Sequence, residues 1–404
     1  MSIMKILHIY HIYPALFGGA SRVVYEVTKE LTKRGHKVSI LTTDAYFDDK
    51  NEQEYKNGNI TIFRFSTLFS WFAKKNIVLP SVDFILWVKR ILRRFDCIHM
   101  HGHRNPYNVF ISHYARKYNI PYIVQAHGDI PRIGAWRRLK WLYDVLFGYR
   151  LLHDASKVVA LSRFEADQYR CMGVPEEKIA IIPNGIDLSE YAALPPKGAF
   201  KRKFGIPEEK KIILYLGRIH KTKGIDFLIK AYAHLINDMH YEDALLVLAG
   251  PDDGYVKEAK SLAQNLSISN FVLFTGLLSE EDKIRAYIDS DVVVNVEPLN
   301  VYGLVPLESA ACSKPVVVSK TNAISEVVAT GKFGYSVKYG SVTSLAFTLR
   351  KILSNEEFAR HLGRNGRRYV FNYLDWRKII KKYEQVYKEV ANSEGRHMCP
   401  LKIF

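Results

Sequence analysis

The sequence predicts an α/β protein built from two doubly wound parallel-sheet domains that face each other across a cleft. Three observations predict this class. Short apolar runs alternate with helical stretches along nearly the whole chain, which is the pattern of parallel strands joined by helical crossovers. A polar stretch at 188–210 interrupts the alternation, which then restarts. Finally, 404 residues are too many for one ordinary hydrophobic core.

The first set of runs begins with a strand–helix–strand unit. Residues 5–14 are strand-like, 18–36 carry apolar residues at helical spacing with a glycine near the end, and 37–43 are apolar again. A unit of this length joins parallel strands. Further strand-like runs follow at 60–65, 97–101, 121–127, 157–162 and 178–184. We therefore expect a Rossmann-like N-terminal domain over 1–187.

The second half of the chain repeats the pattern. The stretch 188–210 contains Pro195-Pro196 and mixed charges, which predicts a linker. Apolar runs then recur at 211–217, 244–250, 271–276, 291–296, 315–319 and 335–338. We expect a second Rossmann-like domain over 211–374. The last segment, 375–404, is predicted to form a C-terminal helix that packs back on the N-terminal domain.

Composition sets broad limits on the function. Apolar residues make up 48% of the chain and charged residues 25%, which predicts a globular protein. The four cysteines lie far apart and indicate a reduced, intracellular chain. We expect no signal peptide and no membrane span. The net charge of +17 predicts an anionic partner: nucleic acid, a membrane surface or a phosphorylated small molecule.

A basic loop follows the strand-like run 211–217. Arg218 and Lys223 flank the turn between this run and the next helical stretch, where α/β proteins bind anions. A guanidinium and an ammonium group together suit a diphosphate. The alternative interpretation is a solvated basic loop.

A second candidate site lies at 300–319. Gly303, Leu304 and Val305 would present backbone N–H groups at the start of a short helix, where such groups bind phosphate oxygens. Glu308 lies one turn further and could accept hydrogen bonds from two ribose hydroxyls. The alternative for Glu308 is an acidic side chain stabilised by the helix dipole.

These motifs together resemble family 4 of the retaining glycosyltransferases, which have the GT-B fold. The matching segments occur in the family's order over nearly the whole chain. They are the Gly18-Gly19 turn, QAHGD (125–129), LSRFEADQY (161–169), IIPNGID (181–187), YLGRIHKTKG (215–224) and GLVPLESAACSKPVV (303–317). The resemblance implies a hexosyltransferase that uses a nucleoside-diphosphate sugar as donor substrate and retains the anomeric configuration, without a cofactor.

The resemblance also implies roles for individual residues. Arg218 and Lys223 would hold the donor diphosphate, and Glu308 the ribose. The backbone at Gly18 and Gly19 would approach the donor phosphate from the first domain. His127 would lie near the transferred sugar; the alternative is a strand-end histidine whose hydrogen bonds are satisfied within the fold.

The sequence departs from the family at Asn300. The family commonly has two glutamates separated by seven residues; Glu308 matches the second, and Asn300 stands at the first position. An amide can bond a sugar hydroxyl, but it lacks the negative charge of a carboxylate. Glu297, three residues earlier, could take part. This departure leaves open a non-catalytic nucleotide-sugar-binding relative as an alternative.

No metal site is predicted. The paired aspartates Asp48-Asp49 and Asp252-Asp253 lie in polar stretches typical of solvated turns. In the motif HMHGH (99–103), the three histidines would share one face of a strand, and imidazoles bind zinc. No carboxylate or cysteine with clear spacing completes a site there, so we expect no bound metal.

The charge distribution indicates a partner for the first domain. Two stretches, 84–95 and 132–150, combine lysines and arginines with aromatic residues. They are either interfacial membrane helices or ordinary amphipathic helices with solvated charges. A lipid-linked or other glycan acceptor at an anionic membrane surface would explain them, and we expect a cytoplasmic protein, peripheral at the inner face of the cell membrane. A soluble sugar-phosphate acceptor is the alternative. No nucleic-acid recognition motif is present, so we expect no nucleic-acid partner.

Overall fold

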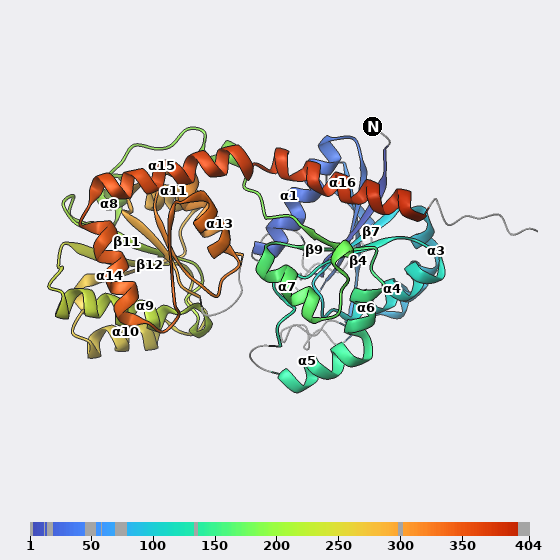
Figure 1. Ribbon diagram of the computed structural model, residues 1–404, viewed down its shortest axis with the longest axis horizontal. Helices are drawn as coiled ribbons and strands as arrows, with labels where there is room; N and C mark the ends of the chain where they lie inside the picture. The colour runs from blue at the N-terminus through green and yellow to red at the C-terminus, as the bar shows by residue number, and fades with distance from the viewer. Residues whose placement is uncertain are drawn as a thin grey trace, which may run out of the picture. The chain divides into compact units, whose positions relative to one another are not determined.

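The computed structural model describes residues 3–11, 13, 19–44, 54–57, 59–68, 79–132, 136–297 and 302–394. The chain divides into two compact units (Figure 1). The first unit comprises Met1–Gly185 together with Trp376–Phe404, and the second comprises Ile186–Asp375. The chain therefore leaves the first unit once and returns to it at its end.

Within the described ranges, the first unit has a sheet of eight strands in the order β10-β9-β8-β7-β1-β2-β4-β3. All neighbours are parallel except β3, which is antiparallel to β4. The strands are β1 (Lys5–Ile9), β2 (Lys37–Thr43), β3 (Glu54–Asn57), β4 (Ile60–Phe65), β7 (Cys97–His101), β8 (Tyr122–Gln125), β9 (Lys157–Ala160) and β10 (Ile179–Ile181). Separately, β5 (Thr67–Leu68) pairs with β6 (Leu79–Pro80) in the antiparallel sense. Every residue of the central strand β7 is buried, as expected for a parallel strand covered on both faces.

In the described residues of the first unit, the helices are α1 (Gly19–Lys33), α3 (Val82–Ile91), α4 (Pro106–Lys117), α5 (Arg137–Tyr143), α6 (Tyr149–His153), α7 (Arg163–Cys171) and α16 (Trp376–Glu394). Short helical turns lie at η2 (Leu92–Arg94), η3 (Asp144–Gly148) and η4 (Glu176–Lys178). Helix α1 buries one apolar stripe that includes Val23, Val27 and Leu31. Gly35 ends it with a left-handed backbone, φ +89°, as the sequence predicts.

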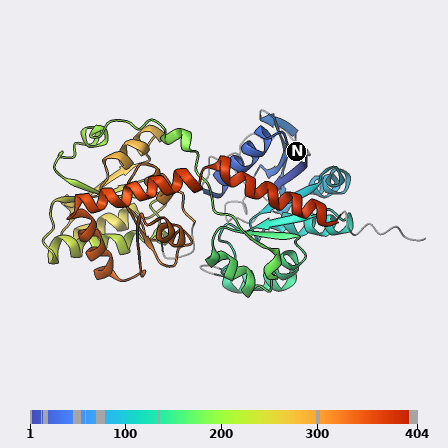
Figure 2. The same ribbon diagram turned by 45° about the horizontal axis from the view of Figure 1, so that its top comes forward.

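Helix α16 belongs to the first unit although it comes last in the chain. It packs on α1 and on β7, and Figure 2 shows it lying along this unit. Glu384 accepts hydrogen bonds from Arg34 (2.6 Å) and His36 (3.1 Å). The hydroxyls of Tyr383 and Tyr387 bond Gln125 of β8 and His99 of β7, at 3.0 and 2.7 Å. The helix therefore supplies polar partners to side chains buried in the sheet.

In the described part of the second unit, six parallel strands run in the order β13-β12-β11-β14-β15-β16. They are β11 (Lys211–Leu216), β12 (Ala244–Ala249), β13 (Val272–Gly276), β14 (Val292–Asn295), β15 (Val316–Ser319) and β16 (Gly334–Val337). The order reverses between β11 and β14, so consecutive crossovers leave in opposite directions there. Ligands of doubly wound sheets bind at the carboxyl ends of the strands beside such a point.

The helices of the second unit are α8 (Ala199–Phe204), α9 (Ile225–Ala233), α10 (Val256–Asn265), α11 (Glu280–Asp289), α12 (Val305–Ala311), α13 (Ile324–Gly331), α14 (Val342–Leu353) and α15 (Glu356–Tyr373). Short turns lie at η5 (Leu188–Tyr191), η6 (Lys221–Lys223), η7 (His234–Asp238) and η8 (Ser269–Phe271).

Residues 188–210, predicted as a linker, fold as part of the second unit. Helix α8 forms there and packs on α11. The Asp289 carboxylate at the end of α11 accepts hydrogen bonds from the N–H groups of Gly198, Phe200 and Lys201, at 2.6–3.0 Å. The carboxylate thus satisfies the donors that a helix leaves unpaired at its start. Because the capping carboxylate lies about 90 residues further along the chain, the local composition of 188–210 could not predict it.

The loops after β11 and β12 touch through their backbones. A Cβ at position 250 would stand 1.9 Å from the carbonyl oxygen of Gly217, and Gly250 has φ +147°. Ile219 donates its N–H to the Pro251 carbonyl at 2.9 Å, and Asp253 donates to the Ile219 carbonyl at 3.0 Å. Only glycine allows this close approach, which fixes the path of the chain around Arg218.

We predict that Gly250→Ala destabilises the protein by more than about 3 kcal/mol, because the methyl group meets backbone and not a movable side chain. Gly254→Ala is the matched control. Gly254 also has a positive φ, +80°, but in the described part of the chain no atom lies within 4 Å of its Cβ position. It should cost only about 1–2 kcal/mol. Urea unfolding measures both values, and equal losses would contradict the assigned role of the contact.

Candidate active site

The predicted basic loop lies at the carboxyl end of β11, beside the point where the strand order reverses. Arg218 lies two residues past the strand, and its Nη1 lies 2.5 Å from Oδ2 of Asp253, which follows the neighbouring strand β12. The side chains of this pair are 63% and 40% exposed. An ion pair this exposed contributes at most about 1 kcal/mol, so Arg218 can exchange Asp253 for another anion at little cost.

Lys223 is held more tightly. Its Nζ lies 2.8 Å from Oε2 of Glu297, and both side chains are largely buried. Glu297 follows β14, the strand that pairs with β11. Gly224, with φ +70°, lets the loop pass close to the end of β14, because a Cβ there would stand 2.4 Å from the Val296 carbonyl oxygen. The two strands on either side of the reversal therefore contribute one cation and one carboxylate to the same place.

Glu308 lies in the first turn of α12 and is 6% exposed. Its Oε2 accepts a hydrogen bond from the Tyr287 hydroxyl at 2.7 Å, and its Oε1 lies 3.6 Å from Nζ of Lys283. Burial, together with the neighbouring Glu308 carboxylate, raises the pKa of Tyr287 well above its usual value, so the phenol stays a donor. Helix α11 therefore orients the carboxylate. The sequence carries no local signal for this pair, since its members are 21 positions apart in the chain.

The backbone predicted to bind phosphate lies immediately before and within α12. The helix begins at Val305 with Leu304 preceding it, and the Leu304 carbonyl accepts the N–H groups of Leu307 and Glu308, both at 2.9 Å. The first N–H groups of a helix have no acceptor inside it, so those of Gly303, Leu304 and Val305 are suited to an anion. Asn300 lies outside the described residues, as does Gly18.

In the first unit, His127 lies just beyond β8 with a left-handed backbone, φ +53°. Its Nε2 is 2.8 Å from Nδ1 of His101 on β7. Burial lowers the pKa of His127 to about 4, so the ring is neutral at pH 7. Gly19 is the first residue of α1, and no heavy atom of the described residues lies within 4 Å of the position that a Cβ would take there.

Glu165 supports the turn that carries His127. Its two carboxylate oxygens accept the N–H groups of Gly128 and Leu161, each at 2.7 Å, and the residue is 1% exposed. Tyr169, one turn further along α7, accepts the Ala126 N–H at 2.8 Å. Two of the motifs noted in the sequence, 125–129 and 161–169, are therefore in direct contact, which their spacing could not reveal.

The histidines of the motif at 99–103 separate into two environments. His99 and His101 lie on β7, as predicted, but His103 lies past the strand, and its Nε2 is 3.1 Å from Oδ1 of the buried Asp144. His8 of β1 takes the third place beside His99 and His101. Their ring nitrogens lie within 4.8 Å of one another, and three imidazoles can together bind zinc, so the expectation of no bound metal stays a prediction.

The remaining paired aspartates have a structural role where they are described. Asp252 accepts the N–H groups of Gly254, Tyr255 and Val256 at 2.9–3.2 Å and so shapes the turn into α10. Asp48 and Asp49 lie outside the described residues.

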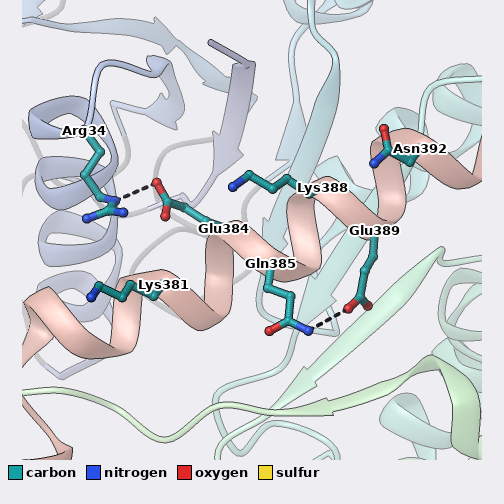
Figure 3. Close-up of a pocket in the computed structure, with 7 residues that line it drawn as sticks. All are labelled: Arg34, Lys381, Glu384, Gln385, Lys388, Glu389 and Asn392. Atoms are coloured by element: carbon teal, nitrogen blue, oxygen red, sulfur yellow. Dashed lines mark hydrogen bonds and ion pairs between the residues drawn. The ribbon is translucent and has the colours of Figure 1, made fainter. Parts of the chain in front are cut away.

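A surface groove of the first unit is lined by residues at the end of α1 and along α16: Arg34, Lys381, Glu384, Gln385, Lys388, Glu389 and Asn392 (Figure 3).

The fold and the basic carboxyl edge of the second sheet are typical of α/β proteins that bind nucleotides. The family described as Glycosyl transferases group 1 matches residues 196–369, and Glycosyltransferase Family 4 matches residues 17–190. The chain belongs to this family of glycosyltransferases, and the resemblance drawn from its motifs is confirmed. It is a retaining enzyme that transfers a sugar from a nucleotide sugar.

Individual relatives show how widely the family varies. The chain is 26% identical to an N-acetyl-alpha-D-glucosaminyl L-malate synthase of Bacillus anthracis over 95% of its own length and 96% of the relative. It is 25% identical to an alpha-monoglucosyldiacylglycerol synthase of Streptococcus pneumoniae, over 85% of this chain and 77% of the relative. The crystal structure of Anabaena HepE in complex with UDP-glucose is similar at a TM-score of 0.73 and 19% identity, covering 96% of this chain and 100% of that one. This likeness confirms the predicted GT-B fold class.

The helices of the described residues include none that is both long enough and apolar enough to cross a bilayer.

Glu165 generates a prediction for the pH dependence of stability. Burial raises its pKa to about 7, although two N–H donors favour the carboxylate, while an unfolded chain has the ordinary value of 4.5. Between these values the folded state holds more protons, so the free energy of unfolding decreases as the pH rises. From pH 5 to pH 7 the contribution of this group should fall by about 2 kcal/mol.

Glu165→Gln removes this titration. The difference in unfolding free energy between the wild type and the variant should therefore be smaller at pH 7 than at pH 5, by that amount. Urea unfolding at the two pH values measures it. Glu177→Gln, which alters an exposed glutamate of the same unit, serves as the control for the loss of one carboxylate. A pH-independent difference for Glu165→Gln would contradict the assignment.

Proposed function

We propose that this enzyme transfers a hexose from a nucleoside-diphosphate hexose to a lipid-linked acceptor at an anionic membrane surface. The observation that carries the donor half of the proposal is the position of Arg218 and Lys223 at the carboxyl end of β11. Both cations flank the point at which the strand order of the second sheet reverses. A diphosphate is the ligand that a guanidinium, an ammonium group and helix-start amides suit together.

Each residue has a role in the proposed reaction. Arg218 and Lys223 bind the diphosphate: Arg218 exchanges Asp253 for phosphate oxygens, and Lys223, whose ammonium has three donors, binds it while keeping Glu297. Glu308, oriented by Tyr287, accepts hydrogen bonds from the ribose hydroxyls. The further donor contacts come from the N–H groups of Gly303, Leu304 and Val305, the backbone at Gly18 and Gly19, the Asn300 amide, and His127 at the sugar.

The chemistry depends mostly on the leaving group. The bond between the anomeric carbon and the diphosphate oxygen breaks, and a bond to the acceptor oxygen forms on the same face of the sugar. The acceptor's proton passes to the departing diphosphate oxygen. Negative charge builds up on the diphosphate, and one cation at about 4 Å from it contributes roughly 4 kcal/mol at an effective dielectric constant of about 20. UDP-glucose is the first donor to test, because the similar HepE structure holds it.

The acceptor half of the proposal rests on a surface of the first unit that we call the docking segment, residues 136–150. Its exposed apolar side chains are Trp136, Leu139, Trp141, Leu142, Val145, Leu146, Phe147 and Tyr149, which are 38–65% exposed. The exposed cations Arg137, Arg138 and Arg150 lie among them. Exposed apolar patches of this kind mark interaction sites, and aromatic residues beside cations favour the membrane interface.

A buried polar cluster holds the other side of the docking segment. Asp144, which is fully buried, contacts Arg104 (2.8 Å), Arg132 (2.7 Å) and His103 (3.1 Å). These donors, acting against burial, keep the pKa of Asp144 well below its usual range. The segment is thus anchored to its own unit through charge, while its apolar side chains point to solvent, the reverse of an ordinary surface helix. Figure 1 shows α5 at the edge of this unit.

The other basic stretch, 84–95, lies outside the docking segment and is anchored in the core of the first unit. Its apolar residues Phe84, Val88, Ile91 and Leu92 are buried there, whereas Leu86 is 58% exposed. Its cations occupy the outer face of α3 and of the turn that follows.

A lipid acceptor is supported by the similarity to the alpha-monoglucosyldiacylglycerol synthase of Streptococcus pneumoniae. The malate-modifying relative makes a soluble acceptor the alternative outcome.

Removal of either cation tests the donor site. We expect Arg218→Ala and Lys223→Ala each to lower kcat for UDP-glucose turnover by about 10²–10³-fold, because each removes charge from the leaving group. Lys221→Ala is the matched control: the side chain is exposed in the same loop, and its loss should change kcat less than about threefold. Near-normal turnover by a folded Arg218 or Lys223 variant would refute the assignment.

Sedimentation with liposomes tests the acceptor side. The protein should bind vesicles that contain phosphatidylglycerol and dissociate as salt is raised, since each cation near an anionic surface adds about 1 kcal/mol. The double variant Trp136→Ser/Trp141→Ser should weaken binding by roughly tenfold or more. Phe347→Ser, which alters a 57% exposed side chain of the second unit, is the control and should bind normally. Binding that is indifferent to anionic lipid and salt would count against the membrane proposal and leave the donor site unaffected.

A further inference from the structure

A chain of three hydrogen-bonded histidines runs through the first sheet and ends at His127. Nδ1 of His8 lies 3.0 Å from Nε2 of His101, and Nδ1 of His101 lies 2.8 Å from Nε2 of His127. The rings come from β1, from β7 and from the residue just past β8, three neighbouring strands. Successive rings are nearly parallel, with interplanar angles of 16° and 22°. The inference below rests on the proposed position of His127 at the donor sugar.

The three rings are neutral at physiological pH. Burial lowers the pKa of His8 to about 3 and that of His127 to about 4, and it holds the pKa of His101 well below its usual value. A neutral imidazole carries one N–H and one acceptor nitrogen. Each hydrogen bond of the chain therefore has one donor, and the direction of the first bond sets the direction of the second.

The far end of the chain decides this direction. Nε2 of His8 is buried and has no hydrogen-bond partner among the described residues. A buried N–H without an acceptor is rarer and costlier than a buried acceptor without a donor. The His8 proton is therefore favoured on Nδ1, where it is donated to His101. His101 is then protonated on Nδ1 and donates to Nε2 of His127.

We propose that this chain fixes His127 in the tautomer that carries its proton on Nδ1, so that His127 donates a hydrogen bond to an oxygen of the donor sugar. His101 and His8 are positioning residues in this arrangement, because they act through His127 and not on the substrate. The direction of the chain makes Nδ1 of His127 the only ring nitrogen of this residue that can donate. An oxygen with a lone pair, such as a sugar hydroxyl or ring oxygen, is the partner it suits.

The competing occupant of the same residues is a metal ion. His8, His99 and His101 could hold one, but a metal on His8 or His101 would take nitrogens that the hydrogen-bonded chain uses. Both nitrogens of His101 already have histidine partners. Metal content therefore distinguishes the two arrangements.

The experiment is ¹⁵N NMR of histidine-labelled protein without a histidine tag, with the His127 signals assigned from His127→Gln. We expect His127 to be protonated on Nδ1 with a constant spectrum between pH 5.5 and 8. His101→Phe should leave a mixture of tautomers at His127 and lower kcat by about three- to tenfold, with the KM for UDP-glucose little changed. His101→Asn keeps a donor near the Nδ1 position and should restore both. His99→Asn, on the same strand but outside the chain, is the control and should leave the His127 tautomer unchanged.

A proton on Nε2 of His127 in the wild type, or one equivalent of bound metal, would overturn the inference. Once His127 is assigned, the wild-type spectrum decides the question even where a His101 variant fails to fold. The proposed function can fail separately. If His127 has the expected tautomer but His127→Ala turns over UDP-glucose normally, the hydrogen-bonded histidine chain is confirmed and the position of His127 at the sugar is wrong. If only the tautomer prediction fails while the Arg218 variant is inactive, the donor site stands.

Discussion

The structure depends on the burial of parallel strands on both faces. Helices cover the sheets so completely that all of β7, β14 and β15 is buried. Apolar residues fill most of these positions, and the hydrophobic effect of burying them is the main driving force for folding. A side chain that reacts or binds has room only where a strand ends. The candidate site residues Arg218, Glu297 and His127 each lie within two residues of the end of a strand for this reason.

Burying a polar group costs free energy, and a hydrogen-bond or ion-pair partner offsets that cost. Glu308 bonds Tyr287, Glu165 bonds two backbone amides, and Asp144 is surrounded by two arginines and a histidine. These contacts fix side chains in one orientation, which is what a site needs before a substrate arrives. In the second unit, the exposed Arg218 is held weakly and Lys223 strongly, so the two cations differ in how much freedom they have to meet a ligand.

Much of this arrangement was predictable because it is local. Apolar runs bounded by glycines mark the strands, and Arg218 and Lys223 lie in the loop that follows one of these runs, so their place at its carboxyl end could be inferred. The partners were not predictable, because tertiary packing supplies them from far along the chain: Glu297 for Lys223, Tyr287 for Glu308, and Asp289 for α8. The histidines illustrate both cases. Strand alternation correctly predicts that His99 and His101 lie together. It does not predict that His8 joins them through the pairing of β1 with β7, or that His103 lies past the strand, where it contacts Asp144.

The return of α16 to the first unit has a consequence for biosynthesis. Tyr383 and Tyr387 are the residues that bond Gln125 and His99 inside the sheet, and Glu384 bonds Arg34 and His36. A ribosome makes these three residues after the entire second unit. While the second unit is being translated, the side chains of Gln125, His99, Arg34 and His36 in the nascent first unit therefore lack these partners. The first unit is synthesised first, but its fold can be completed only last.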